Sequence, residues 1–143
     1  MSTTATKYAV ASAPLFAGLS KKQQEHLEQL STVIEVKAGV ELTREGQIGR
    51  EFGVLLDGTA TVSIDGKTVA TLAAGDHFGE MSLLAEFGQG DVHRSATVVA
   101  DGDQWIAVMS LVEFRTLLRE FPEINITLQA SADERAASNK AIH

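Results

Sequence analysis

The sequence contains no cysteine, little basic charge and no long apolar run. Without cysteine, the 143-residue chain can form no disulfide, no zinc–thiolate site and no thiol nucleophile. Its 12 Lys and Arg against 19 Asp and Glu give a net charge of −7 and argue against the broad basic surface of a nucleic-acid-binding protein. No apolar run approaches the ~20 residues of a membrane-spanning helix. Internal repeats and low-complexity segments are also lacking.

The length and composition fit one soluble globular domain. A chain of 143 residues with 44% apolar residues can bury a real hydrophobic core. Ala11-Ser12-Ala13 is similar to a signal-peptidase site, but the apolar stretch after Lys7 is shorter than the ~7–15 residues of an export signal. We therefore expect a cytoplasmic protein, with an N-terminal arm over residues 1–14 and one domain over residues 15–143.

Short β-rich runs separated by glycines predict a mostly β domain between residues 31 and 110. Asp65-Gly66 is a typical two-residue hairpin turn, and Asp57-Gly58 predicts a second tight turn. Seven or eight short strands at this spacing indicate a jelly roll. The predicted strands are TVIEV, VELT, EFGVLL, TATVSI, TVATL, SATVVA and WIAVM.

Helical patterns flank the β-rich region on both sides. Ser20 is a good N-cap for the helix KKQQEHLEQL, and Ser110 can cap LVEFRTLLREF. Pro122 ends that second helix and can occupy the first turn of a last one, PEINITLQASADERAASNKAIH.

The segment from Gly75 to Ala100 combines groups that suit a sugar phosphate. Gly79 allows the backbone a close approach, and the helix expected from Glu80 directs free N–H groups at an anion. The guanidinium of Arg94 is permanently charged and fits a phosphate, whereas the Glu80 carboxylate can accept from a ribose hydroxyl.

Two motifs in this segment resemble the phosphate-binding cassette of the cyclic-nucleotide-binding domains. They are Phe78-Gly79-Glu80-Met81-Ser82-Leu83-Leu84 and, after a loop, Arg94-Ser95-Ala96-Thr97-Val98. The resemblance, to the catabolite-activator and protein kinase A regulatory-subunit type, implies an eight-stranded jelly-roll barrel with flanking N- and C-terminal helices. It also implies ligand contacts from Phe78, Gly79, Glu80, Met81, Ser82, Arg94, Ser95, Ala96, Arg135 and Asn139, with Arg135 on the phosphate side and Asn139 at the base.

The function implied by the resemblance is regulatory binding rather than catalysis. We expect the ligand to be cAMP, with cGMP as the second candidate, and no metal. Binding would move the C-terminal helices and act in trans on a separate effector protein, since no output module is evident; a nucleotide buffer or a piece of a longer protein are the other options. The helix seam Ile124, Leu128, Ser131, Arg135, Ser138 and Ile142 is half polar, which predicts a monomer or a weak homodimer.

Two alternatives remain open at the level of sequence. The loop between the motifs is longer than usual in the family and carries Glu86 and Asp91, which can repel a phosphate. This favours a degenerate domain that contacts proteins without a ligand. His77 and His93, together with Glu80, also permit a small cupin-like metalloenzyme, although the H-x-H pair of the cupins is missing.

Overall fold

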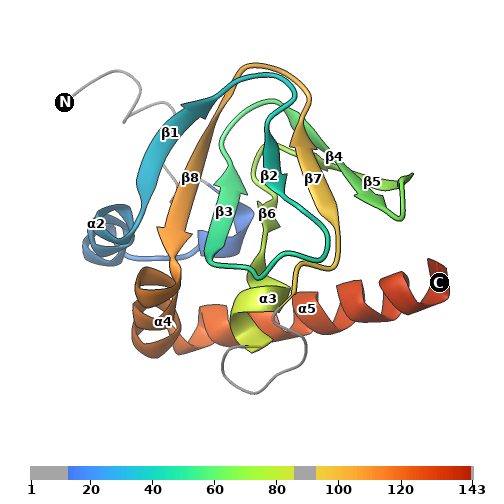
Figure 1. Cartoon of the computed structure of the whole chain (residues 1–143). Coiled ribbons are helices and arrows are strands. Elements are labelled where there is room, and N and C mark those ends of the chain that lie inside the picture. Colours follow the sequence, from blue (N-terminus) through green and yellow to red (C-terminus); the bar gives the residue numbers. More distant parts are fainter. Residues whose placement is uncertain (1–12, 86–92, 143) are drawn as a thin grey trace.

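The computed structural model, which describes residues 13–85 and 93–142, consists of two antiparallel four-stranded sheets with helices at one side (Figure 1). One sheet has the strand order β1-β8-β3-β6 and the other β2-β7-β4-β5. The strands are β1 (Thr32–Val36), β2 (Glu41–Thr43), β3 (Glu51–Leu55), β4 (Thr59–Ile64), β5 (Lys67–Ala73), β6 (His77–Phe78), β7 (Thr97–Ala100) and β8 (Gln104–Ser110). The helices are η2 (Pro14–Phe16), α2 (Lys21–Leu30), α3 (Glu80–Ala85), α4 (Leu111–Glu120) and α5 (Pro122–Ile142).

The expected mostly β fold is confirmed, but the expectation of a closed barrel was wrong. The eight described strands form two separate sheets, whose edge strands are not hydrogen-bonded to each other. A core of apolar side chains from both sheets fills the space between them, as in a sandwich. Its members are Val36, Leu55, Ala60, Leu72, Phe78, Val98, Ala100 and Ile106.

A second core lies between the helices and the outer face of the β1-β8-β3-β6 sheet. This sheet is therefore covered on both faces, and four consecutive residues of β3, Phe52 to Leu55, are buried rather than alternating. Phe52 packs on Phe114 of α4 with ring centroids 5.0 Å apart. The two-sided burial holds β3 and its neighbour β6 firmly, and β6 leads directly into the cassette.

Side-chain caps fix the starts of the two predicted amphipathic helices. Ser20 and Gln23 form a reciprocal capping box at α2, and Ser110 and Glu113 form another at α4. The predicted hairpin turn is also confirmed, because Asp65 and Gly66 both have positive φ, 52° and 78°, between β4 and β5.

Helix α5 lies along one end of the sandwich and packs on α4, α3 and η2 (Figure 1). Ile124 and Leu128 are buried in the chain's own core. One and two turns further along the same stripe, Ser131 and Arg135 contact the segment from β6 to α3. The first four of the six seam positions proposed for a weak dimer therefore face the chain itself. Among the described helices, none is both long enough and apolar enough to cross a membrane.

Gly53 of β3 generates a prediction about stability. A Cβ atom at this position would lie 2.2 Å from Phe78 Cζ, because the far end of the Phe78 ring occupies that space. We expect Gly53→Ala to lower the free energy of unfolding by about 1–3 kcal/mol through overpacking. Urea denaturation measures this change.

Gly102→Ala is the matched control, because no atom lies within 4 Å of the Cβ that it would add. It should change the free energy of unfolding by no more than about 0.5 kcal/mol. Equal effects of the two substitutions would contradict the close packing of Phe78 on β3.

Candidate functional site

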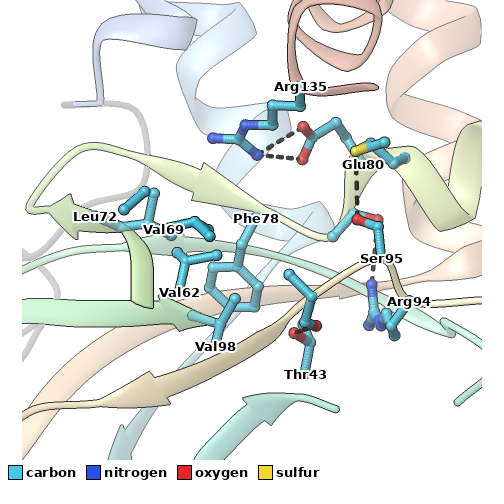
Figure 2. Close-up of a pocket in the computed structure, with 14 residues that line it drawn as sticks. Thr43, Val62, Val69, Leu72, Phe78, Glu80, Arg94, Ser95, Val98 and Arg135 are labelled. Atoms are coloured by element: carbon cyan, nitrogen blue, oxygen red, sulfur yellow. Dashed lines mark hydrogen bonds and ion pairs between the residues drawn. The ribbon is translucent and has the colours of Figure 1, made fainter. Parts of the chain in front are cut away.

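A cavity of about 270 Å³ opens between the β2-β7-β4-β5 sheet and the segment that joins β6 to α3 (Figure 2). One wall is aliphatic and comes mainly from β4, β5 and β7. The opposite wall is polar and carries Glu80, Arg94, Ser95 and Arg135. The aliphatic residues are Val62, Val69, Ala70, Leu72 and Val98. Such a cavity suits a small ligand with one apolar face and one charged end.

Gly79 is required by its backbone conformation and by its neighbours. Its φ is +90°, and an added Cβ would lie 2.6 Å from the Glu51 carbonyl oxygen and 2.7 Å from Arg94 Nη1. The sequence led us to expect a close approach of ligand to this glycine. In the structure, the missing side chain makes room for the guanidinium of Arg94.

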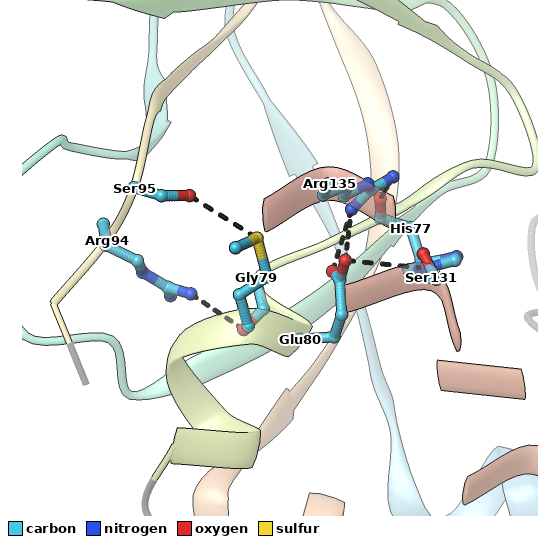
Figure 3. Close-up of polar contacts among 8 residues, drawn as sticks. His77, Gly79, Glu80, Arg94, Ser95, Ser131 and Arg135 are labelled. Carbon is cyan, nitrogen blue, oxygen red and sulfur yellow. Dashed lines mark hydrogen bonds and ion pairs between the residues drawn. The ribbon is translucent and has the colours of Figure 1, made fainter. Parts of the chain in front are cut away.

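Arg94 is buried, with 9% of its surface exposed, and its guanidinium is held by main-chain oxygens. Nη1 donates to the Gly79 carbonyl at 3.2 Å (Figure 3). Nη2 donates to the Glu51 carbonyl at 2.8 Å. Burial lowers the pKa of Arg94, but a guanidinium stays protonated in proteins. The two carbonyls orient the positive charge without neutralising it, and the nearby carboxylates of Glu51 and Glu80 favour the charged form.

Glu80, at the start of α3, is fully buried and forms an ion pair with α5. Arg135 Nη1 donates to both carboxylate oxygens, at 2.6 Å and 2.9 Å, while Nη2 donates to the His77 carbonyl at 2.9 Å (Figure 3). Arg135 lines the cavity. The family resemblance implies that it lies on the phosphate side of a ligand, and in the structure it contacts Glu80, the residue expected to accept from the sugar.

His77 is a further member of this polar cluster. Its Nε2 lies 3.1 Å from Ser131 Oγ of α5 and 3.9 Å from Glu80 Oε1. Burial lowers the pKa of His77; Glu80 and Asp76 oppose that shift, and Arg135 adds to it. From the sequence, His77 was expected only as a possible metal ligand, and its contact with α5 was not predicted. Its position three residues before Glu80 could have indicated that the two side chains belong to the same polar cluster.

The remaining cassette residues contribute packing and shape. Phe78 is buried between the sheets, and Ser95 Oγ donates to Met81 Sδ at 3.6 Å. The Ala96 carbonyl accepts from Thr43 Oγ1 at 2.9 Å, and Thr43 also lines the cavity. Thr43 was not predicted from the sequence as a site residue. Ser82 lies in α3 and Asn139 in α5, but their side chains are outside the described part of the structure, as is the loop with Glu86 and Asp91.

Within residues 13–85 and 93–142, no three His, Asp or Glu side chains are grouped closely enough to hold a metal ion. His93, the second histidine of the cupin-like alternative, is exposed and its backbone forms an isolated bridge with Ile48. The described residues thus offer no candidate metal centre.

The buried ion pair generates a prediction that does not depend on any ligand. In Arg135→Met, the Glu80 carboxylate stays buried but loses its donor, so we expect the free energy of unfolding to fall by about 1–3 kcal/mol. Glu134→Gln, at an exposed position of the same helix, should change it by at most about 0.5 kcal/mol.

A double-mutant cycle with Glu80→Gln isolates the pair itself. We expect a coupling energy of about 0.5–3 kcal/mol between positions 80 and 135, measured by urea denaturation. Strictly additive effects of the two substitutions would show that the pair does not hold α5 in solution.

Comparison with known proteins identifies the type of domain. A family model described as the cyclic nucleotide-binding domain matches residues 33–121. A cAMP-dependent protein kinase regulatory subunit of Schizosaccharomyces pombe is 34% identical over 106 residues, which cover 73% of this chain and 24% of that protein. A cyclic nucleotide-gated potassium channel of Rhizobium etli is 33% identical over 126 residues, which cover 88% of this chain and 34% of that protein.

The fold is shared with solved structures as well. The structure of cAMP-bound PfPKA-R superimposes with a TM-score of 0.81 at 22% identity, over 96% of this chain and 48% of that one. This chain spans only about a quarter to a third of the length of the two curated relatives. The matched family model covers the cassette, both sheets and α4. The chain therefore belongs to the family of cyclic nucleotide-binding domains.

Proposed function

We propose that this domain binds a cyclic purine nucleotide reversibly, with cAMP as the preferred ligand, and that it does so without catalysing a reaction. The observation that carries the proposal is the convergence of Arg94 and Glu80 on one cavity, from segments that lie on opposite sides of the loop 86–92. The relatives named above, a kinase regulatory subunit and a gated channel, support a regulatory role.

The phosphate end of the ligand is assigned to Arg94. Two of its N–H groups are used by the Gly79 and Glu51 carbonyls, and a guanidinium has five. The others can donate to the exocyclic oxygens of a cyclic phosphate, aided by the backbone N–H groups at the start of α3. Because the carbonyls already orient the guanidinium, little side-chain entropy would be lost on binding.

The ribose is assigned to Glu80. An ionised carboxylate offers about four acceptor positions. Arg135 Nη1 occupies one on each oxygen, so a 2′-hydroxyl can still donate to the remaining ones. Arg135 would then hold the carboxylate in position for the sugar, rather than contact the phosphate.

The base is assigned to the aliphatic wall formed by Val62, Val69, Leu72 and Val98. These side chains give van der Waals contact to any purine and offer no hydrogen bond that separates adenine from guanine. The Ser95 hydroxyl, which can favour guanine, has the Met81 sulfur as a partner. We therefore propose a modest preference for cAMP over cGMP, with Asn139 as the candidate contact to the adenine amine.

Signalling is assigned to α4 and α5. Helix α5 contacts the cassette directly through Arg135, and it follows α4 in the chain after the single residue Phe121 and packs on it. A ligand that alters the contacts of Glu80 would thus bias the position of both helices. We propose that a separate effector protein reads this change, with the domain itself a monomer or a weak homodimer.

A second function, a ligand-free protein-interaction module, is favoured by one observation. The Glu80 carboxylate has a charged partner within its own chain, so the buried acid is stable without a sugar. In that case, α5 would be fixed on the cassette and the cavity would have no cyclic-nucleotide ligand. Calorimetric titration of the purified domain with cAMP and cGMP separates the two functions, because only the first predicts saturable heat.

Arg94→Leu tests the phosphate assignment. Loss of one partner of a buried charge pair costs about 2–5 kcal/mol. The dissociation constant for cAMP should therefore rise by ~30-fold to several thousand-fold at about 1.4 kcal/mol per decade. Arg44→Leu is the control, because Arg44 is exposed and pairs with Glu41. Unchanged affinity in a folded Arg94→Leu protein would remove Arg94 from the site.

2′-Deoxy-cAMP tests the ribose assignment. The wild-type domain should bind it distinctly more weakly than cAMP, because the 2′-hydroxyl loses its acceptor. In Glu80→Ala, the ratio of the two affinities should fall toward one. Equal discrimination by both proteins, measured by competition against a fluorescent cAMP analogue, would mean that another group contacts the sugar.

A further inference from the structure

We propose that His77 is a positioning residue that holds α5 over the cavity in its neutral form, and that its protonation releases the helix and weakens nucleotide binding. The inference rests on the proposed function and adds a regulator, the proton, to the same site. It is carried by the placement of one partly buried imidazole between the cassette and two residues of α5.

Both the ring and the main-chain carbonyl of His77 contact α5. Its ring Nε2 lies 3.1 Å from Ser131 Oγ, and its carbonyl accepts from Arg135 Nη2 at 2.9 Å. Figure 3 shows the ring beside Ser131, with the Glu80–Arg135 pair next to it. The ring of Phe52 in β3 lies 5.9 Å away, centroid to centroid, and limits where the imidazole can move.

The charged groups around His77 come from three segments. Glu80 of α3 and Asp76 of the preceding turn favour a cation, whereas Arg135 of α5 and burial oppose it. The Glu80 carboxylate, 3.9 Å from Nε2, accepts from Arg135 on both oxygens. An imidazolium would therefore compete with Arg135 for Glu80 and repel the guanidinium at the same time.

The protonation also changes the hydrogen bond to α5. A neutral imidazole can accept from the Ser131 hydroxyl at Nε2, and an imidazolium can only donate. The Ser131 hydroxyl would have to turn so that its oxygen accepts from the imidazolium, which would also lie close to the Arg135 guanidinium. Both effects act on the two α5 residues that hold the helix on the cassette, and Arg135 is itself part of the cavity wall.

The sign of the pH dependence follows from the lowered pKa of His77. With α5 docked, the pKa lies below the ordinary value of 6.5, so the docked helix favours the neutral ring. The stabilisation of the docked state is complete above pH 6.5 and is lost as the pH falls below it. Since one proton is involved, affinity for cAMP should fall by at most about tenfold per pH unit in this range.

The experiment is calorimetric titration with cAMP at pH 7.5, 6.5 and 5.5 for the wild type, His77→Gln and His26→Gln. Glutamine places an uncharged amide near the position of Nε2 and does not titrate. His26 of α2 pairs with Glu120 of α4, away from the cassette residues, and is the histidine control. We expect affinity to fall with acidification in the wild type and in His26→Gln, and to change much less in His77→Gln.

Two results would overturn the inference. One is an equal loss of affinity in His77→Gln and the wild type. The other is a gain of affinity on acidification in the wild type, because it would mean that the added positive charge attracts the phosphate and the helix stays in place.

An NMR titration of the wild-type His77 ring avoids any concern that the variant folds poorly. Because linkage is reciprocal, saturation with cAMP must lower the pKa of His77 further. A pKa that stays the same or rises on binding contradicts the inference.

Absence of cAMP binding at every pH would refute the proposed function and still leave His77 testable. In that case, hydrogen-exchange protection of the α5 amides, corrected for the intrinsic effect of pH, should fall below pH 6.5 in the wild type and remain in His77→Gln. Equal protection in the two proteins would exclude the positioning role.

Discussion

The fully buried carboxylate of Glu80 is the constraint on which the rest of the site depends. A carboxylate withdrawn from water must be paired and hydrogen-bonded, or it destabilises the fold. The short strand β6 delivers Glu80 to the interior, and no carbonyl or aliphatic neighbour can stabilise its charge. Arg135, 55 residues later in the chain, supplies the stabilising charge. An acid in the cassette thus holds the part of α5 that carries Arg135.

The apolar packing of α5 makes this arrangement possible. Ile124 and Leu128 hold the first half of the helix in the core shared with α4 and β3. This anchoring brings Ser131 and Arg135 to the cassette at little further cost in chain entropy. The second half of α5 is alanine-rich and polar, and the contacts that its described side chains make with the cassette are hydrogen bonds and an ion pair. The apolar half therefore fixes the helix direction, while the polar half responds to charge at the site.

Local signals in the sequence were sufficient for most of the fold. Serine caps, the Asp65-Gly66 turn and runs of β-branched residues gave the helix starts and seven of the strands, because each depends on a few adjacent residues. The two-residue strand β6 was missed, since it has no run of its own and forms only beside β3. The prediction of a barrel was wrong in that the two sheets of the described residues do not close on each other. Pairing between edge strands is a long-range property that no short pattern specifies.

The part of the candidate site that lies in short sequence motifs could be predicted. Gly79, Glu80 and Arg94 were found from residue chemistry and the family resemblance, and they line one cavity. The partner of Arg135 was not predictable, because a helix with weak amphipathic character does not indicate which face docks or where. The aliphatic wall was equally hidden, since valines and leucines of a sandwich look alike whether they fill the core or line a cavity.

The two arginines of the cavity differ in whether their hydrogen-bond partners carry a charge. Carbonyl oxygens hold Arg94 and leave its charge in place, whereas Glu80 neutralises Arg135. Together, the three groups carry a single positive charge, which matches the single negative charge of a cyclic phosphodiester. A second cation, such as protonated His77, would add a positive charge beside Arg135, which already has Glu80 as its partner. The net charge of the cavity would then no longer match that of the ligand. The same balance that suits the proposed ligand therefore favours a neutral His77.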